Sequence, residues 1–391
     1  MDSSIKKFNY SYKYRLYPTA EQRTLLAKHF GASRYLYNHF LTKRKDTYLA
    51  SKTNLNYYDN ARELTTLKKE FTWLKEVGSQ TLQFSLKCLD GAYNRFFNGL
   101  AKFPTYKSKH HNNQSFRAPQ NVRIIKGKLV IPKFLEGIPM VLHRDLEGDV
   151  KFATVSRNKS GQYFVSITVE REITPLPITD KMVGVDLGIK TLAVCSDGKT
   201  YKNIKAYREL KQKKIKLQRQ HANKENGSRN KERVRQKLAK VYQKMVNIRQ
   251  DNLHKVTKQI IDENQVIVME TLAVKNMMKN HCLAGAIADC SWSEFNRMLE
   301  YKALWCGRTI VRLSRWFPSS KTCHECGWIN QGLRLKDRSW SCGGCGQVVD
   351  RDLNAARMIL KQGLIEKQLP LERREDKRVD SGRKLVEVST G

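Results

Sequence analysis

The stretch Val183-Gly-Val-Asp186-Leu-Gly-Ile-Lys190 joins a short apolar run to a carboxylate. The apolar run predicts a buried strand, and the charge that follows must reach solvent, a donor or a cation, because burying it alone is costly. Glu270 repeats this arrangement after Val266-Ile-Val-Met269. Taken singly, each acid is also explained by a turn cap or a solvated strand end. If the two strands are parallel neighbours, however, both carboxylates meet at one edge of a sheet.

A third acidic motif, Asp350-Arg-Asp352-Leu-Asn-Ala-Ala356, predicts the start of a short helix that ends near Leu360. Either aspartate could be a plain helix N-cap. Residues 182–270 predict three short strands, a long helical pair and a closing strand. One apolar face of the second helix of the pair is indicated by residues that recur at intervals of three and four: Val234, Leu238, Val241, Met245 and Ile248.

The N-terminal part of the chain is predicted to be a strand followed by helices. Residues 5–17 alternate in polarity, which is typical of a strand. Thr19 and Gln22 have the spacing of a capping box that opens a helix, and Gly31 predicts the end of that helix. Residues 20–100 are mostly helical by pattern.

A β-rich segment follows. Residues 101–117 are polar and basic and predict a loop or linker, whereas the pattern over 118–171 has the period of two that is typical of strands. The two prolines in Ile173-Thr-Pro-Leu-Pro-Ile-Thr predict a linker after it.

Four cysteines form two C-x-x-C pairs, Cys323-His-Glu-Cys326 and Cys342-Gly-Gly-Cys345, with fifteen residues between them. Two residues between thiols let each pair turn back and present both sulfurs to one ion, so the spacing predicts a closed, structural zinc site. The alternatives are two unrelated cysteine pairs or a redox site. His324 is expected to be a spectator, because four sulfurs already fill a tetrahedral shell.

The charge of the chain indicates a polyanionic partner. Its 391 residues include 73 Lys and Arg against 37 Asp and Glu, a formal charge of +36. Such an excess opposes compact folding unless a polyanion screens it, and nucleic acid is the obvious one. The sequence has no long uncharged apolar run, so we expect no membrane span, and its start does not resemble a signal peptide. The scattered cysteines favour a reduced, cytoplasmic protein.

Three carboxylates in so basic a chain have a chemical rationale. Phosphodiester hydrolysis needs an activated water and neutralisation of charge at the attacking and leaving oxygens, which two divalent cations about 3.5–4 Å apart can provide. Mg²⁺ prefers carboxylate oxygens, and Mn²⁺ could replace it.

The ordered motifs resemble the TnpB family, nucleases encoded by bacterial insertion sequences and similar to the ancestors of type V CRISPR effectors. The resemblance rests on the three acidic motifs and the cysteine pairs, together with Tyr14-Arg-Leu-Tyr-Pro18, Tyr35-Leu-Tyr-Asn-His-Phe40 and Asn247-Ile-Arg-Gln-Asp-Asn-Leu-His-Lys-Val-Thr257. It covers residues 5 to about 360.

The resemblance implies a multidomain protein of α/β and α+β class with an RNase H-like (RuvC) nuclease domain. It implies the following division: N-terminal strand of a wedge-like β-barrel 1–18, helical recognition insert 19–117, wedge β-barrel 118–175, first part of the nuclease domain with the basic helical pair 176–316, zinc knuckle 317–349, final nuclease helix 350–362 and mobile tail 363–391.

The resemblance also implies an activity, partners and site residues. The chain would bind a guide RNA from the element's end, as one protein per RNA, and cut matching double-stranded DNA beside a short motif in the bacterial cytoplasm. The catalytic acids would be Asp186, Glu270 and Asp352, holding two Mg²⁺, with Asp350 as the competitor for the third place. Tyr57 and Gln83 would face the DNA motif.

Residues 201–250 hold 17 Lys or Arg and three acids. A solvated face is the ordinary explanation of a charge run, but three acids cannot supply helical ion-pair partners for so many bases. We therefore expect phosphate contacts with an RNA–DNA duplex. The candidate contact residues are Lys213, Lys214, Lys216, Arg219, Arg233, Arg235 and Lys237.

Two other functions remain open at this point. The first is an RNA-guided DNA-binding regulator without nuclease activity, although the intact acids argue against it. The second is a strand-transfer transposase. Its expected His-hydrophobe-His motif is missing, because the adjacent pair His110-His111 has the wrong spacing.

Overall fold

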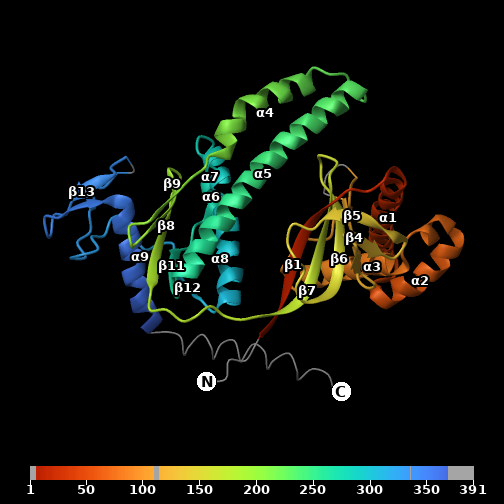
Figure 1. Ribbon diagram of the computed structural model, residues 1–391, viewed down its shortest axis with the longest axis horizontal. Coiled ribbons are helices and arrows are strands. Elements are labelled where there is room, and N and C mark those ends of the chain that lie inside the picture. The colour runs from red at the N-terminus through yellow and green to blue at the C-terminus, as the bar shows by residue number, and fades with distance from the viewer. Residues whose placement is uncertain (1–5, 110–113, 335, 369–391) are drawn as a thin grey trace. The chain divides into compact units, whose positions relative to one another are not determined.

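The computed structural model describes residues 6–109, 114–334 and 336–368 (Figure 1). The chain forms two compact units, Met1–Ile173 and Thr174–Gly391, and each is described by itself. His110, His111 and the predicted tail from residue 369 onward lie outside the described residues.

The first unit contains an antiparallel seven-stranded sheet in the order β2-β6-β7-β1-β5-β4-β3. β1 pairs with β7 and β5, so the N-terminal strand is an interior strand of the sheet. Its alternate residues Tyr12, Tyr14 and Leu16 lie in the core. The strands are β1 (Lys6–Leu16), β2 (Gln114–Ala118), β3 (Arg123–Ile125), β4 (Lys128–Ile131), β5 (Phe134–Val141), β6 (Asp149–Arg157) and β7 (Tyr163–Ile173).

Helices inserted between β1 and β2 form a second core in this unit. They are α1 (Ala20–Ser51), α2 (Tyr57–Glu70), the short 3-10 helix η1 (Thr72–Glu76) and α3 (Ser79–Phe97). The predicted capping box is present, because the Thr19 side chain accepts from the Gln22 backbone and the Gln22 side chain accepts in return. The first turns of α1 pack on the sheet through Leu26 and Phe30.

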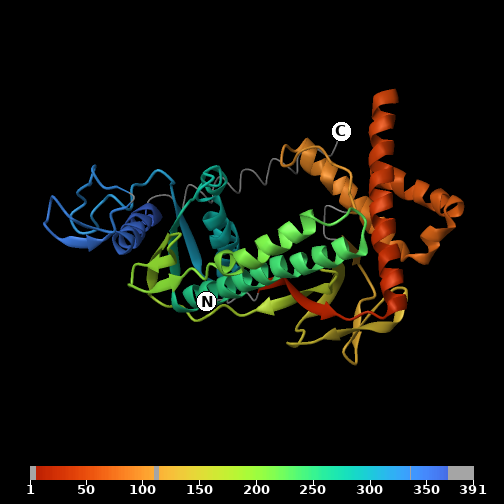
Figure 2. The same cartoon turned by 90° about the horizontal axis from the view of Figure 1, so that it is seen from above.

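Two sequence predictions for this unit are wrong. Gly31 does not end a helix, and Figure 2 shows α1 as one unbroken rod. Nothing lies within 4 Å of a Cβ placed at Gly31, so the glycine marks neither a cap nor a close approach. The loop expected to run to residue 117 ends earlier, because β2 pairs with β6 and buries Phe116 and Ala118.

The second unit is built on a five-stranded sheet in the order β10-β9-β8-β11-β12. β9 is antiparallel to both of its neighbours, β8 and β10, whereas β8, β11 and β12 are parallel. The strands are β8 (Met182–Leu187), β9 (Thr191–Cys195), β10 (Thr200–Lys202), β11 (Val266–Glu270) and β12 (Thr309–Leu313).

Helices cover both faces of this sheet. On one face, α5 (Arg229–Glu263), α7 (Ala284–Cys290) and α8 (Trp292–Cys306) pack against Val183 and Val185 of β8. On the other face, α9 (Arg351–Gln368) packs through Ile359 against Val268 and Leu313. Within this unit, α4 (Ala206–Ala222) and the first half of α5 project from the sheet as an antiparallel pair, and the short α6 (Val274–Met277) follows β11 (Figure 1).

The end of α9 corrects a predicted boundary. The mobile tail was expected from residue 363, but the helix continues to Gln368. Gly363 is buried because it packs directly on Val268 of β11, so this last turn still covers the sheet. Before α9, the chain forms a two-stranded ribbon of β13 (Ser339–Ser341) and β14 (Val348–Asp350).

Candidate active site and metal centre

The strand pairing places Asp186 and Glu270 at the same sheet edge. β8 and β11 are adjacent and parallel, and their register pairs Val185 with Met269. Asp186 and Glu270 are the next residue on each strand, and neighbouring strands lie about 4.8 Å apart. The expectation that the two acid-bearing strands are parallel neighbours is therefore confirmed.

Both acids also point to the same face. In β8, Val183 and Val185 belong to the core beneath α5 and α8, which turns Gly184 and Asp186 toward α9. In β11, Val266 and Val268 contact α9 residues, so Glu270 shares their face. The two carboxylates therefore face the helix that carries the third acidic motif.

Asp350 and Asp352 have different positions at the start of α9. The Asp350 side chain accepts a hydrogen bond from the Leu353 backbone N–H at 2.9 Å, which is a helix-capping contact. Asp352 lies in the first turn, and its negative charge acts on Asp186. The structure thus brings Asp352 close enough to Asp186 for its charge to act on it, and leaves Asp350 as the cap.

Negative charge gathers around Asp186. Burial raises the pKa of Asp186 to about 7, with further contributions from Glu270 and Asp352, whereas Arg351 and the Leu187 backbone oppose the shift. Burial likewise raises the pKa of Glu270. A carboxylate whose ionised form is this unfavourable is typical of a site that binds a cation.

Among the residues that the structure describes, the Glu270 side chain has one hydrogen-bond partner, Ser319. The Ser319 hydroxyl donates a hydrogen bond to its Oε1, and the Ser319 side chain is almost completely buried. Ser319 follows β12, which leaves the sheet at the same edge as β11. The hydrogen bond fixes one oxygen of Glu270 and opposes the upward shift of its pKa.

If Glu270 holds a metal ion and the chain cuts DNA, as the family resemblance implies, replacing Ser319 with alanine should weaken metal binding rather than folding. Loss of a partner of a ligating carboxylate typically costs about 10–100-fold in metal affinity or activity. The measurement is the Mg²⁺ concentration that gives half-maximal DNA cleavage. Ser319→Thr, which keeps the hydroxyl, should need the same Mg²⁺ concentration as the wild type. The neighbouring Ser320→Ala is the control. An equal Mg²⁺ requirement in Ser319→Ala and Ser320→Ala would remove Ser319 from the site.

Gly184 allows α9 to approach β8. A Cβ at this position would lie 2.1 Å from the Ala356 carbonyl oxygen and 2.7 Å from the Leu360 nitrogen, both backbone atoms that cannot rotate away. Asp352 lies one helical turn before Ala356. Any side chain at Gly184 would therefore displace the helix that carries Asp352.

The variant Gly184→Ala is expected to be less stable by about 1–3 kcal/mol, the usual cost of overpacking. If the chain cuts DNA, as the family resemblance implies, the variant should also cut it more slowly. Chemical unfolding and a cleavage assay measure the two effects. Gly31→Ala is the matched control, because the added methyl group meets nothing and the helix gains about 0.5–1 kcal/mol. Wild-type cleavage by Gly184→Ala would contradict the close approach.

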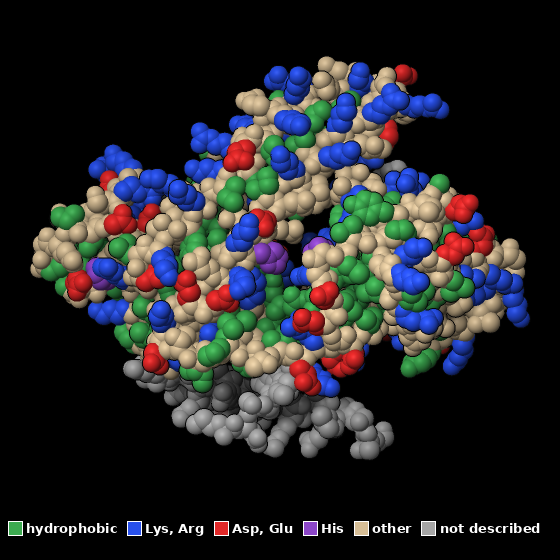
Figure 3. Space-filling view, in the orientation of Figure 1, with side chains coloured by type: hydrophobic (Ala, Val, Ile, Leu, Met, Phe, Trp, Pro, Cys, Tyr) green, Lys and Arg blue, Asp and Glu red, His purple; other side chains and the backbone are tan. Residues whose placement is uncertain are grey.

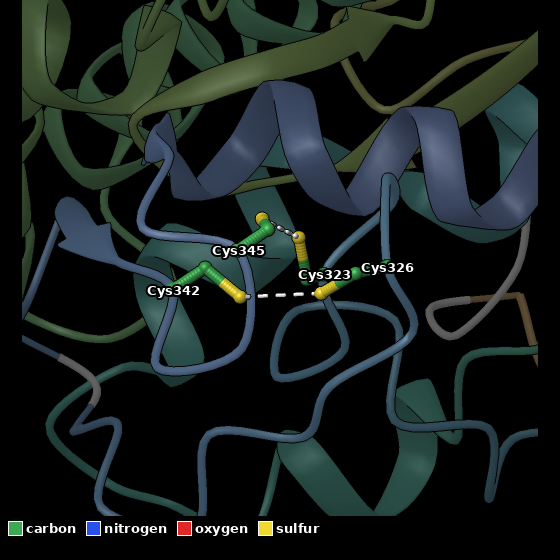
Figure 4. A group of neighbouring side chains, drawn as sticks. All are labelled: Cys323, Cys326, Cys342 and Cys345. Atoms are coloured by element: carbon green, nitrogen blue, oxygen red, sulfur yellow. Dashed lines mark hydrogen bonds between the residues drawn. The ribbon is translucent and has the colours of Figure 1, made fainter.

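The four predicted cysteines form one cluster (Figure 4). Their sulfur atoms all lie within 4.8 Å of one another. Sγ of Cys323 is 3.9 Å from Sγ of Cys345, and Sγ of Cys326 is 3.4 Å from Sγ of Cys342. Zinc–thiolate bonds of about 2.3 Å in a tetrahedron require sulfurs nearly 3.8 Å apart, so the donor set fits Zn²⁺.

The backbone repeats the same turn at each pair. The Gly327 N–H donates to the Cys323 carbonyl and the Gly346 N–H donates to the Cys342 carbonyl, each at 2.9 Å. Both glycines have positive φ, 79° and 72°, which few other residues adopt without strain. The two turns are therefore equivalent knuckles, and a small core that includes Trp340 and Val349 supports them.

The zinc module is tied to α9 by a buried amide. Asn354 is only 1% exposed, and its side chain donates to the Thr322 carbonyl at 2.7 Å and accepts from the His324 backbone N–H at 3.0 Å. The His324 ring contacts Asn354 and Arg357. His324 thus takes part in docking the knuckle on the helix that carries Asp352.

Four site features were not predicted from the sequence: Ser319, Gly184, Asn354 and Arg338. The guanidinium of Arg338 lies 3.4 Å from an Asp352 oxygen and is half exposed. No local pattern signals these contacts, because each joins residues far apart in sequence. The Asn354 position inside the acidic motif was the one available hint.

The basic helical pair consists of α4 and the first half of α5. Most of its predicted contact residues are exposed, and Figure 3 shows many Lys and Arg side chains on its outer part. Two of the seven have partners within the chain: Lys214 donates to the Tyr207 hydroxyl at 2.9 Å, and Arg235 pairs with Glu232. Among the described residues, four others form no ion pair: Lys213, Lys216, Arg219 and Lys237. The remaining one, Arg233, reaches Asn230 at 3.4 Å.

Tyr57 and Gln83 lie on one surface of the first unit. Tyr57 is the first residue of α2, and the Lys87 ammonium lies 5.4 Å from its ring centre. Gln83 is exposed on α3 one turn before Lys87. The structure therefore brings both residues to the same patch.

Three family models match the chain. Residues 164–281 match the OrfB proteins of IS605-type elements, a family described as "Probable transposase", and residues 292–359 match a family described as "Cas12f1-like, TNB domain". Residues 8–53 match a model described as "Helix-turn-helix domain", although this span holds β1 and the single helix α1.

Two similar proteins span nearly the same length. A Streptomyces pristinaespiralis protein, provisionally named RNA-guided DNA endonuclease, is 40% identical over 359 residues, covering 90% of this chain and 89% of the relative. The similarly named InsQ of Escherichia coli K12 is 33% identical over 373 residues, with coverages of 90% and 92%.

A solved structure shares the fold. The chain named Cas12f1, solved in complex with single guide RNA and target DNA, matches with a TM-score of 0.55 at 14% identity, covering 90% of this chain and 98% of that one. Separately, no helix in the described ranges is both long and apolar enough to cross a membrane.

Proposed function

Because this chain belongs to the TnpB family, the OrfB proteins of IS605-type elements, we propose that it is an RNA-guided DNA endonuclease of a transposable element. It would cut double-stranded DNA that matches its guide RNA, next to a short flanking motif, in the bacterial cytoplasm. The observation that carries the proposal is the position of Asp186 and Glu270 at one sheet edge, facing α9, whose first turn carries Asp352.

The sheet topology supports an RNase H-like (RuvC) nuclease domain. Three antiparallel strands, β10, β9 and β8, continue into the parallel strands β11 and β12, with helices on both faces. The seven-stranded sheet and the helices of the first unit would be the wedge barrel and the recognition insert. The proposed division keeps residues 317–349 as the zinc knuckle.

The acidic cluster fits divalent cations. Burial and the charges of Glu270 and Asp352 raise the pKa of Asp186 to about 7, although Arg351 opposes the shift. Two Mg²⁺ ions held by Asp186, Glu270 and Asp352 would supply an activated water and would neutralise charge on the attacking and leaving oxygens. Ser319 would orient Glu270, and Gly184 would let α9 bring Asp352 close.

The other contacts have complementary roles in this proposal. The exposed bases of α4 and α5 would hold the backbone of an RNA–DNA duplex without reading its sequence. Tyr57 and Gln83 would face the DNA motif. One protein chain per guide RNA, with one Zn²⁺ at the four cysteines, would form the active particle.

The raised pKa of Asp186 predicts how pH affects the metal-free protein. A folded-state pKa of about 7, above the ordinary 3.8, means that the stability associated with its proton is fully present below 3.8 and is lost as the pH rises through 7. In the presence of a chelator, Asp186→Asn should therefore stabilise the protein. The gain should grow by about 2–3 kcal/mol between pH 5 and pH 8.

Denaturant unfolding at the two pH values measures this effect, with the exposed Asp180→Asn as the control. A gain that does not depend on pH would contradict the raised pKa. Mg²⁺ should stabilise the wild type more than Asp186→Asn, since the variant lacks one of its ligands.

The function is tested by purifying the chain with its bound RNA, sequencing that RNA and offering a plasmid that contains the matching DNA. The expected result is Mg²⁺-dependent cutting of the matched plasmid and none of a mismatched one. Binding of the target without cutting would favour the nuclease-inactive regulator instead. Joining of element ends by this protein alone would favour a transposase.

A further inference from the structure

A cationic pocket lies in the first unit, where the end of β1 meets the start of α1 and the hairpin between β6 and β7. It encloses about 350 Å³. Its lining includes Arg15, Tyr17, Arg23, Arg157 and Tyr163 and no acidic residue. A second pocket of the same unit, of about 310 Å³, has four acidic residues in its lining. The lack of acidic residues therefore distinguishes the cationic pocket from its surroundings.

Arg15, like Arg23 and Arg157, forms no ion pair with any residue that the structure describes. Its guanidinium lies 5.0 Å from the ring centre of Phe164 and 5.5 Å from that of Tyr17. Its Nε is buried and has no hydrogen-bond partner among the described residues. Burial lowers the pKa of Arg15. A buried donor without a partner is costly. The terminal nitrogens of the Arg15 guanidinium are the donors that an anion in the pocket would use.

The other two arginines are held in place around it. The Nε of Arg23 donates to the Pro18 carbonyl at 3.0 Å, which leaves its terminal nitrogens available. Arg157 lies over the ring of Tyr163, 5.5 Å from its centre. It ends β6 just before a turn that the Asn158 side chain closes by accepting from the Gln162 N–H at 2.8 Å. The three guanidinium groups thus come from elements fixed by their own contacts.

The aromatic rings suit a base beside the anion. Tyr17 is 56% exposed, so one side of its ring is open to a ligand, whereas Tyr163 is buried. Arginine next to an open tyrosine ring is the usual way in which proteins bind an unstacked base and its phosphate. Unpaired nucleotides of this kind occur in the loops and bulges of folded RNA, but not in intact duplex DNA.

We propose that this pocket binds one unpaired nucleotide of the guide RNA, with its phosphate on Arg15, Arg23 and Arg157 and its base stacked on Tyr17. The proposal rests on the proposed function, because it names a subsite for the RNA partner. It assigns to the first unit an RNA contact that is independent of the basic helical pair.

The test uses the full chain freed of RNA and a fluorescently labelled single-stranded oligouridylate, with binding followed by anisotropy over a range of salt concentrations. Arg15→Gln should bind about tenfold more weakly and show a salt slope smaller by about one. Tyr17→Ala should lower the affinity for the oligouridylate about fivefold to hundredfold, which is the usual contribution of one stacked base. Tyr17→Phe should bind like the wild type. Arg123→Gln, an exposed arginine on β3, is the matched control.

Several results would overturn the proposal. One is equal affinity of Arg15→Gln and Arg123→Gln, and another is equal affinity of Tyr17→Ala and Tyr17→Phe. Equal losses with an oligodeoxyuridylate would reject RNA as the specific occupant. If Arg15→Gln does not fold, the exposed Arg23→Gln makes the same comparison. If the wild type cuts DNA with its guide and the pocket variants bind RNA as well as the wild type does, this pocket is rejected but the proposed function stands. If the wild type itself binds no RNA, the proposed function is rejected as well.

Discussion

Asp186→Ala should abolish DNA cutting while leaving guide and target binding unchanged. The side chain lies at the centre of the acidic cluster, and the charges of both Glu270 and Asp352 act on it. Removing it takes away a shared ligand, and the loss of such a group lowers turnover by about 10³-fold or more. Single-turnover cleavage and a target-binding assay, made on the same RNA-loaded preparation, separate the two effects.

The start of α9 provides the matched comparison. Asp352→Ala should be as severe as Asp186→Ala, whereas Asp350→Ala should cost only about 0.5–2 kcal/mol of stability, because Asp350 caps the helix. If Asp350→Ala stops cutting and Asp352→Ala does not, the two roles must be exchanged. Retained cutting by Asp186→Ala would remove that residue from the site altogether.

Cys323→Ser should release the zinc and unfold the knuckle. Structural zinc contributes about 10–16 kcal/mol to the folding of small zinc modules, far more than the small core around Trp340 can replace. Cutting should fall as well, since Asn354 ties the knuckle to α9 and Ser319 precedes the first cysteine pair. Zinc content by mass spectrometry, limited proteolysis and cleavage rate are the measurements.

The control for this variant is Cys282→Ser, an exposed cysteine of the same unit that lies outside the cluster. It should keep the wild-type zinc content and cleavage rate. If Cys323→Ser also retains its zinc, the four-thiolate site is wrong. Loss of zinc without any loss of cutting would show that the knuckle does not position Ser319 or Asp352.

The acidic strand ends could be predicted because the relevant information is local. An apolar run followed by a carboxylate occurs at both Asp186 and Glu270, and the parallel pairing of β8 and β11 brings them together. The cysteine spacing likewise fixes a metal site within one segment. In both cases the chemistry of a few neighbouring residues limits the structures that the chain can adopt.

The contacts that support the site could not be predicted, because they depend on tertiary packing. Ser319 is one of two consecutive serines, and only the exit of β12 at the same edge as β11 selects it as the partner of Glu270. Nothing in the sequence distinguishes Gly184 from other glycines in strands, because its role depends on the close approach of α9. The sequence offers no register between segments so far apart.

Local signals also failed where tertiary contacts overrode them. Gly31 was expected to end a helix, yet α1 continues because Leu26, Phe30 and Leu36 bury its face against two successive cores. Glycine in a helix interior costs about 1 kcal/mol, which this burial outweighs. Residues 114–117 were predicted to belong to a loop because of their polarity, but the burial of Phe116 and Ala118 fixes β2 in the sheet.

The three-acid metal site can be tested by anomalous diffraction at the manganese edge from crystals of the protein with guide RNA, target DNA and Mn²⁺. Two anomalous peaks are expected within bonding distance of the carboxylates of Asp186, Glu270 and Asp352, beside a DNA phosphate. Peaks located elsewhere, or carboxylates that point away from one another and from the DNA, would contradict this site.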